Sequence, residues 1–204
     1  MDPIQLLMTE HRLIERVLDS LLLCANELSA GAAVERGDLA RFTEFIQEFA
    51  DRGHHAKEEQ VLFDVMASCG FPLGGGPLAV MLAEHDEGRQ MTGVIVASAQ
   101  ATGGWSPPEV GELVHTAGAL RGHLRQHILK EDQILYPMAM NALPAEAMAE
   151  VAERCEAFQS AWEASGEAGR LLSLGKALHS RWGGEDEKAG FVAPRGDAGE
   201  DSDT

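Results

Sequence analysis

The sequence is poor in the residues on which several protein classes depend. Aromatic residues make up 5% of its 204 positions, with a single Tyr, whereas surfaces that stack nucleic-acid bases need more of them. Lys and Arg number 16 against 33 Asp and Glu, so the formal net charge is -17. Phosphate backbones and anionic lipids would be repelled by this charge. We therefore expect no nucleic-acid partner and no membrane partner.

Cysteine is scarce, and long apolar runs are missing. Cys24, Cys69 and Cys155 are odd in number, far apart and in no CxxC pair, which argues against a disulfide framework and a zinc knuckle. No stretch approaches the ~20 consecutive apolar residues that span a bilayer. The first residues lack the basic and apolar segments of a secretory signal. The expected location is the cytoplasm.

The remaining composition is that of an ordinary globular protein. Apolar residues make up 45% and charged residues 24% of the chain, and the length fits one domain with additional segments. We predict a helical bundle over residues 1–143, an accessory helix over 144–182 and an acidic tail over 183–204. The tail is expected to be disordered because its acids greatly outnumber its bases.

Apolar residues recur at spacings of three and four in four long stretches, which predicts four helices. The first covers about residues 3–29, and the second begins near a possible cap at Asp38 and ends near residue 68. The third spans about residues 78–102. Ser106 followed by two prolines predicts the start of the fourth, and Pro137 should kink or stop it.

A further helix is expected after Pro144, followed by another turn or two that ends near Trp182. This segment would pack on the outside of the bundle or at a subunit interface. The predicted fold is all-α: an up-down-up-down four-helix bundle with an additional C-terminal helical segment.

Two of the predicted helices repeat a short motif. Residues 54–63 read HHAKEEQVLF and residues 127–136 read HILKEDQILY, which aligns His54 with His127 and Glu58 with Glu131. A His and a Glu four residues apart lie one above the other on a helix, and both pairs fall on apolar stripes. Two similar helices predict two similar half-sites for metal ions.

The other two helices each carry a histidine on the core stripe, namely His11 and His85. A lone core histidine is more often a hydrogen-bonded structural residue than a ligand. Four of them on consecutive helices, two with Glu four residues later, favour a paired metal site within a bundle. A metal-free scaffold is the alternative; in it, replacing Glu58 and Glu131 by Leu would leave stability unchanged or improved.

These motifs resemble those of a known family. The segment HHAKEE at residues 54–59 looks like the H-F-x-x-E-E motif of hemerythrins, and His127 to Glu131 resembles the fourth-helix motif of the HHE cation-binding branch. The resemblance covers about residues 5–140. It implies a hemerythrin-type bundle that binds two oxo- or hydroxo-bridged non-haem iron ions, with manganese or zinc possible. By position, the implied bridging carboxylates are Glu58 and Glu131, and the implied terminal ligands are His11, His54, His85 and His127.

Two departures from the oxygen-carrying members bear on function. Those members have a second histidine four residues after the third-helix one, where this sequence has Arg89, and an Asp five residues after the fourth-helix His. Here both Glu131 and Asp132 follow that His. The missing histidine argues against a simple reversible oxygen carrier, and His55 could be a seventh ligand. Whether Asp132 or Glu15 takes part stays open.

The resemblance implies small-molecule partners such as O2, H2O2 or NO, with which the di-iron centre would react or which it would sense. The alternative is an iron or redox sensor, or an iron-storage module, without catalytic turnover. Whether the chain is an enzyme stays open, and a homodimer is possible. Among the other polar residues, His123 is placed at the edge of the core stripe, and His115 and His179 are expected to face solvent. Tyr136 is interpreted as a core aromatic rather than a phenol at the irons.

Overall fold

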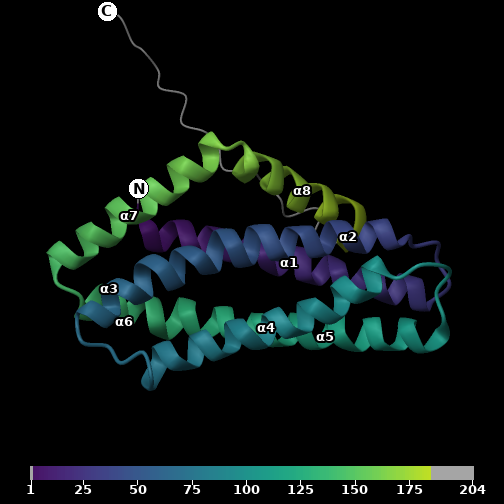
Figure 1. Cartoon of the computed structure of the whole chain (residues 1–204), viewed down its shortest axis with the longest axis horizontal. Coiled ribbons are helices and arrows are strands. Elements are labelled where there is room, and N and C mark those ends of the chain that lie inside the picture. The colour runs from purple at the N-terminus through teal and green to yellow at the C-terminus, as the bar shows by residue number, and fades with distance from the viewer. Residues whose placement is uncertain (1, 185–204) are drawn as a thin grey trace, which may run out of the picture.

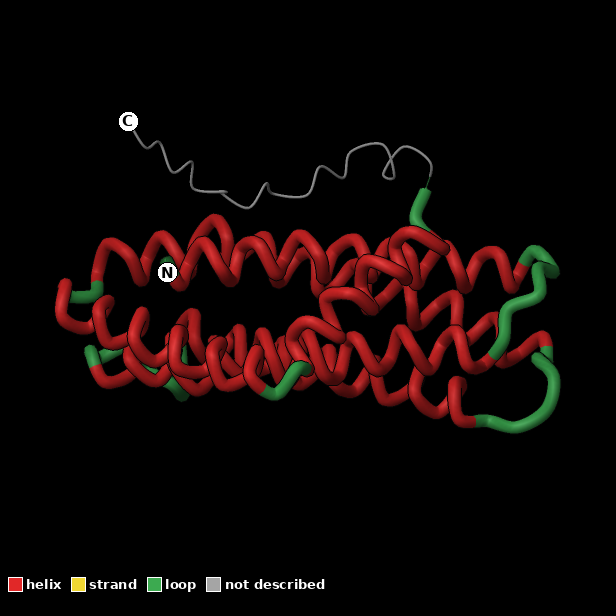
Figure 2. Tube along the Cα trace, turned by 90° about the horizontal axis from the view of Figure 1, so that it is seen from above, coloured by secondary structure: helices red, strands yellow, loops and turns green. Residues whose placement is uncertain are grey.

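The structure is a computed structural model that describes residues 2–184, and the predicted all-α bundle with additional C-terminal helices is confirmed. Four helical rods lie side by side along one axis, with loops at the two ends (Figures 1 and 2). The first rod is α1 (Pro3–Ser29) and the third is α4 (Gly76–Gln100). The second is α2 (Arg36–Glu44), the π-helical segments Phe45–His55 and Glu58–Leu62, and α3 (Phe63–Ser68). The fourth is α5 (Pro107–Lys130), the π-helical turn Glu131–Leu135 and α6 (Tyr136–Ala142).

Local signals in the sequence explain where the rods begin. The Asp2 carboxylate accepts a hydrogen bond from the backbone N–H of Ile4 at 3.0 Å and caps α1. Ser106 is the N-cap of α5, as predicted, and Glu109 accepts from its backbone N–H at 3.0 Å. The prediction for Asp38 was wrong by three residues. Glu35 is the N-cap of α2, and Asp38 accepts from its N–H at 3.3 Å.

The second and fourth rods are π-helical where the repeated motif lies. The two short π-helical turns begin at Glu58 and Glu131. A π turn contains more residues than an α turn, so consecutive side chains are separated by a smaller angle and can share a face. Pro137 was predicted to kink or stop the fourth helix; it does not stop it, because α6 continues to Ala142. Pro137 is accommodated in the first turn of α6, directly after the π turn, where a missing N–H costs little.

The apolar core consists of two clusters with a polar band between them. On α1, Leu7 belongs to one cluster and Ile14 to the other, and His11 lies between them. Phe45 and Phe49 lie in the larger cluster, which fills the end of the bundle at the α2 side. Both clusters exclude water from the band.

Helices α7 (Ala145–Ala164) and α8 (Glu167–Trp182) follow one another at an angle over α1 and the second rod, on the outside of the bundle (Figure 1). Helix α8, with 16 residues, is longer than the one or two turns expected. A Cβ at Gly175 would overlap the ring of Phe45, so α8 approaches the bundle more closely than a larger residue would allow. His179 was predicted to face solvent but is buried in this contact, with Nδ1 3.4 Å from the Ser20 hydroxyl.

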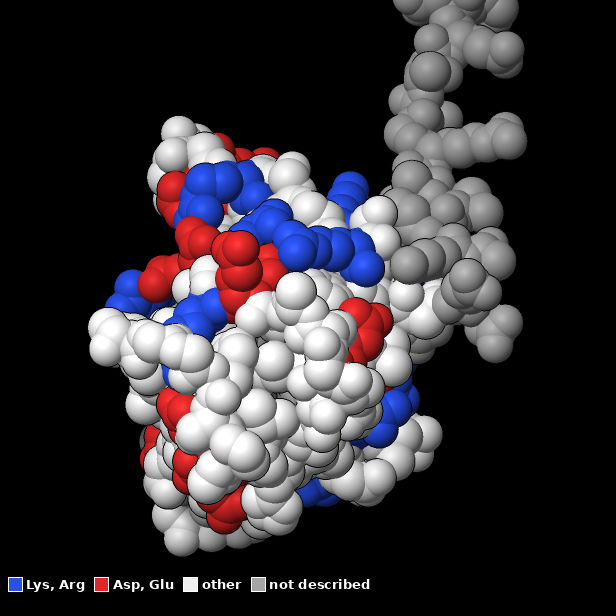
Figure 3. Space-filling view, turned by 90° about the vertical axis from the view of Figure 1, so that its right-hand side faces the viewer, with Lys and Arg blue, Asp and Glu red and all other residues white. Residues whose placement is uncertain are grey.

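Surface charges of both signs lie next to one another in the upper part of the end face drawn in Figure 3, and its lower part carries few. Of the described helices, none has the length and apolar character needed to cross a membrane. Residues 185–204, most of the predicted acidic tail, lie outside the described residues.

Candidate metal centre

The structure brings together all seven residues that the sequence marked as candidate ligands. They come from the four rods of the bundle, and each is at most 7% exposed. They form two groups that share Glu58, and in each group the possible ligand atoms lie within 4.8 Å of one another. The first group is His11, His54, Glu58 and Glu131; the second is His55, Glu58, His85 and His127.

The two glutamates lie between the groups. Oε1 of Glu58 is 3.6 Å from Nε2 of His54, and its Oε2 is 3.4 Å from Nε2 of His85. Oε2 of Glu131 lies 3.2 Å from Nε2 of both His11 and His127. Each carboxylate thus faces imidazoles of both groups, as a carboxylate that bridges two ions must.

Four carboxylates on the outer side of the centre orient four of the imidazoles. Each accepts from the Nδ1 of a histidine on the next rod, so the contacts form a closed ring around the bundle. The pairs are Glu10–His54 (2.9 Å), Glu59–His85 (2.7 Å), Glu84–His127 (3.0 Å) and Asp132–His11 (2.8 Å). A carboxylate on Nδ1 holds the proton there and leaves Nε2 free to donate its lone pair to a metal ion.

Each of these carboxylates is also paired with a cation from the rod that carries its histidine. The ion pairs are Lys57–Glu10, Arg89–Glu59, Lys130–Glu84 and Arg12–Asp132. A cation beside a carboxylate favours the ionised form. The pKa of Glu10 is lowered, because the contacts of His54 and Lys57 outweigh its burial.

One contact shows that the imidazoles fit a metal ion. Nε2 of His85 lies 3.0 Å from Nε2 of His127, while both Nδ1 atoms are engaged by carboxylates. Without a metal ion the contact is favourable only if one ring carries a second proton and donates it from Nε2 to the other ring. When both Nε2 atoms are deprotonated, their lone pairs would repel unless both rings were ligands of one ion.

Orphaned polar atoms lead to the same conclusion. Among the described residues, Nε2 of His54, Oε2 of Glu58 and both carboxylate oxygens of Glu131 are buried without a hydrogen-bond partner. Buried polar atoms without partners are costly, and carboxylates especially so. Imidazole and carboxylate are ligands that iron, manganese and zinc accept. The residues present therefore fit a pair of divalent cations.

Without a metal, protons would take the place of the cations. Burial opposes a charge on His11 and His85, yet contacts with Asp132 and Glu131 raise the pKa of His11 to about 9. Contacts with Glu58 and Glu59 raise the pKa of His85 to about 10. The pKa of Glu58 stays well below its ordinary value despite burial, because His54 and His85 face it. Metal ions must displace these protons to bind.

His55 differs from the other four histidines of the two groups. Burial and the neighbouring charge of His85 lower its pKa to about 4, and its ring stacks on that of His85 with centroids 3.9 Å apart. The second group therefore has three imidazoles although Arg89 stands where the oxygen carriers have a histidine. His55, from the second rod, supplies the third.

Tyr136 is both a core aromatic and a hydrogen-bonding phenol at the centre. It is fully buried, and its hydroxyl donates to Oε1 of Glu58 at 2.5 Å. Its ring is stacked over His11, with centroids 5.6 Å apart. The interpretation as packing alone was wrong. The pKa of Tyr136 is raised far above its ordinary value by burial and by Glu58, so the phenol is a donor here.

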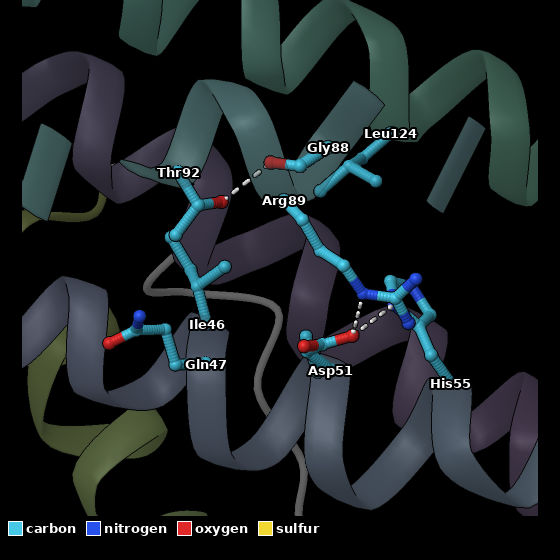
Figure 4. A pocket seen from close by; sticks show the side chains of 9 residues that line it. Ile46, Gln47, Asp51, His55, Gly88, Arg89, Thr92 and Leu124 are labelled. Carbon is cyan, nitrogen blue, oxygen red and sulfur yellow. Dashed lines mark hydrogen bonds and ion pairs between the residues drawn. The ribbon is translucent and has the colours of Figure 1, made fainter. Parts of the chain in front are cut away.

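A surface pocket of about 240 Å³ leads toward the second group (Figure 4). It lies between the second rod and α4, with exposed Gln47 and buried His55 both on its wall. Arg89 from α4 reaches Asp51 at 2.8 Å on one side of the pocket. Apolar side chains and small residues form much of the rest: Ile46, Ala50, Gly88 and Leu124.

Sequence reasoning missed most of the orienting carboxylates. Of the four, the sequence marked only Asp132 as a possible participant, and it did not mark Glu10, Glu59 or Glu84. A signal was present: Glu precedes His at positions 10–11 and 84–85, and a second acid follows Glu at 58–59 and 131–132.

The remaining polar candidates lie outside both groups. Glu15 pairs with Arg12 at 3.0 Å toward the surface. His123 is half-buried, as predicted, with Nε2 2.8 Å from the Glu84 carbonyl oxygen. His115 is exposed, as predicted.

Comparison with known proteins places this geometry in context. Residues 2–139 match the family model described as the hemerythrin HHE cation binding domain. The match includes all seven candidate ligands and ends before α7. No curated protein and no solved structure matches the chain.

Proposed function

Because the chain belongs to the hemerythrin HHE cation-binding family, we propose that its two residue groups hold two non-haem iron ions bridged by Glu58 and Glu131. The centre would react with, or sense, a small molecule such as O2, H2O2 or NO. Bound iron would supply open coordination positions and a change of redox state. The protein orients the imidazoles, excludes water and keeps the Tyr136 hydroxyl against Glu58.

The observation that carries this proposal is the pocket beside His55. Its small volume and partly apolar lining suit small uncharged molecules, and the Arg89 guanidinium is already paired with Asp51, Glu59 and Asp86. A paired guanidinium attracts an anion weakly, because the carboxylates offset its charge. A diatomic or peroxide ligand is therefore a better occupant than an anionic substrate.

Metal analysis tests the central claim. Protein expressed with iron available should contain two iron ions per chain, with charge-transfer absorption that disappears on reduction. Return of the absorption with oxygen or peroxide supports a reactive centre. Two manganese or zinc ions would correct the metal, and a folded protein without stoichiometric metal would refute the proposal.

The role of the pocket can be tested separately. A Cβ at Gly88 would meet Leu124 Cδ2 at 3.4 Å, so Gly88→Leu places its longer side chain in the pocket. We expect a slower rate of NO binding to the reduced, iron-loaded protein, by about tenfold or more, with the metal content unchanged. Gly93→Leu on the exposed face of α4 is the matched control, since no atom lies within 4 Å of its added Cβ. Equal rates in both variants would remove the pocket as the entry.

A sensor or store without turnover is the second candidate. It is favoured by the contact of α7 with Gly53, the residue before His54: a Cβ at Gly53 would overlap the ring of Trp162. A sensor should change the packing of α7 when iron is removed, whereas a reactive centre should keep it. Hydrogen exchange of α7 with and without iron distinguishes the two.

A further inference from the structure

The four cations behind the orienting carboxylates differ in their access to solvent. The side chains of Arg12, Arg89 and Lys130 are 48%, 36% and 36% exposed, whereas that of Lys57 is 0% exposed. Salt and water weaken ion pairs at the surface, and buried pairs are screened much less. The charge of Lys57 therefore acts on Glu10 far more strongly than the other three act on their partners.

Helix α7 encloses Lys57. Oε1 of Gln159 accepts from Nζ at 3.2 Å, and Nζ lies 5.0 Å from the centre of the Trp162 ring and 5.9 Å from that of Phe158. A buried ammonium group needs such acceptors and π faces, because it has lost its water. The bundle alone would leave this side of Lys57 without them.

From Lys57 the contacts continue to the centre. Glu10 binds Nζ of Lys57 with one carboxylate oxygen and Nδ1 of His54 with the other, the second at 2.9 Å. Nε2 of His54 is then directed at Glu58 and has no hydrogen-bond partner among the described residues. The chain of contacts runs from Gln159 through Lys57 and Glu10 to His54.

We propose that Lys57 and Gln159 are positioning residues of the centre, through which α7 sets the metal affinity of the group formed by His11, His54, Glu58 and Glu131. This inference rests on the proposed metal binding. Helix α7 then supports one of the two residue groups, and the group of His55, His85 and His127, whose orienting contacts lie at the surface, does not depend on it. The two ions should bind with unequal sensitivity to changes in α7.

The repeated motif offers a matched control. Lys57 follows His54 by three residues, and Lys130 follows His127 by three residues in the same motif. Lys57→Met and Lys130→Met are the same chemical change, one beneath α7 and one at the surface. Gln159→Leu removes the acceptor from α7 at similar size. Gln159→Glu combined with Glu163→Gln keeps an oxygen for Lys57 and also keeps the hydrogen bond between positions 159 and 163, which is 2.7 Å long in the unaltered protein.

The test measures ferrous iron binding to the full-length variants under anaerobic conditions, by competition with a chelator, at about 50 and 500 mM salt. We expect Lys57→Met to weaken one of the two binding steps by about 10–100-fold at both salt concentrations, as loss of an outer partner does. Gln159→Leu should weaken the same step to a smaller degree, and the double variant Gln159→Glu/Glu163→Gln should leave it close to that of the unaltered protein. Lys130→Met should weaken binding less, with an effect that disappears at high salt.

Three results would overturn the inference. One is unchanged affinity of both steps in Lys57→Met and Gln159→Leu. Another is equal weakening of both steps with loss of helix by circular dichroism, which would make these residues merely structural. The third is an equal effect of Lys57→Met and Lys130→Met. If Lys57→Met does not fold, the comparison of Gln159→Leu with Gln159→Glu/Glu163→Gln tests the inference, because these variants leave the Lys57–Glu10 ion pair in place. Absence of iron binding in the unaltered protein would instead refute the proposed function itself.

Discussion

One of the differences between the two copies of the repeated motif is a hydroxyl at the centre. Position 136 is Tyr where position 63 is Phe, and only the tyrosine donates a hydrogen bond to a carboxylate of the centre, Glu58. Phe63 belongs to the same apolar cluster as Tyr136 and stacks on His85, with ring centroids 6.0 Å apart. The two residue groups therefore differ in the aromatic ring beside them as well as in their number of imidazoles.

Replacing Tyr136 by Phe tests this difference. The change keeps the ring and removes the donor to a buried carboxylate, so we expect the metal-free protein to lose about 1.5–3 kcal/mol in its free energy of unfolding. Urea unfolding in the presence of a chelator measures it. A variant as stable as the unaltered protein would return Tyr136 to a packing role alone.

At the scale of elements, the π-helical segments account for the crowding of ligands on the second rod. His54 and His55 are adjacent in sequence and both buried in the centre. In an α-helix neighbouring side chains diverge by about 100°, whereas the wider π turn brings them closer to one face. This is how one rod supplies an imidazole to each group.

The packing of α7 on the second rod depends on a glycine, Gly53, which has no side chain. We expect Gly53→Ala to lower the free energy of unfolding by about 1–3 kcal/mol, because its Cβ would overlap the Trp162 ring. Gly122→Ala, on an open face of α5, should raise it by about 0.5–1 kcal/mol through helix propensity. Thermal or urea unfolding measures both. The double variant Gly53→Ala/Trp162→Leu should recover part of the loss, and strictly additive effects would contradict the contact.

At the scale of the whole molecule, buried charge links the stability of the metal-free protein to pH. The pKa values of His11 and His85 are about 9 and about 10 in the folded protein, against about 6.5 when unfolded. A raised folded pKa contributes stability that is complete below the unfolded pKa and is lost as the pH rises through the folded value. Iron binding, which needs the deprotonated rings, should strengthen over the same range.

We therefore expect the free energy of unfolding of the chelator-treated protein to fall as the pH rises from about 7 to 10, measured by urea unfolding. His85→Gln should make the fall shallower. His55→Gln is the control, because the pKa of His55 is lowered to about 4 and this ring is neutral throughout the range. A fall as steep in His85→Gln as in the unaltered protein would show that His85 is not protonated in the folded state.

The sequence by itself determined the bundle, the starts of its rods to within a few residues, and the seven side chains that meet inside it. It could do so because apolar spacing and the distance of four between His and Glu are local properties of a helix. Capping at Ser106 is local in the same way, and the family resemblance rested on the same residues.

Only the tertiary structure determined which side chains surround the candidate ligands. The ring of orienting carboxylates joins residues on different rods, as Glu10 joins His54, and no spacing along the chain encodes which rods are neighbours. The burial of Lys57 depends on α7, which lies about a hundred positions later in the sequence. Hydrogen bonds and ion pairs between rods depend on the distances between the rods, and packing sets those distances. The residues that contact the ligands could therefore not be predicted from the motif alone.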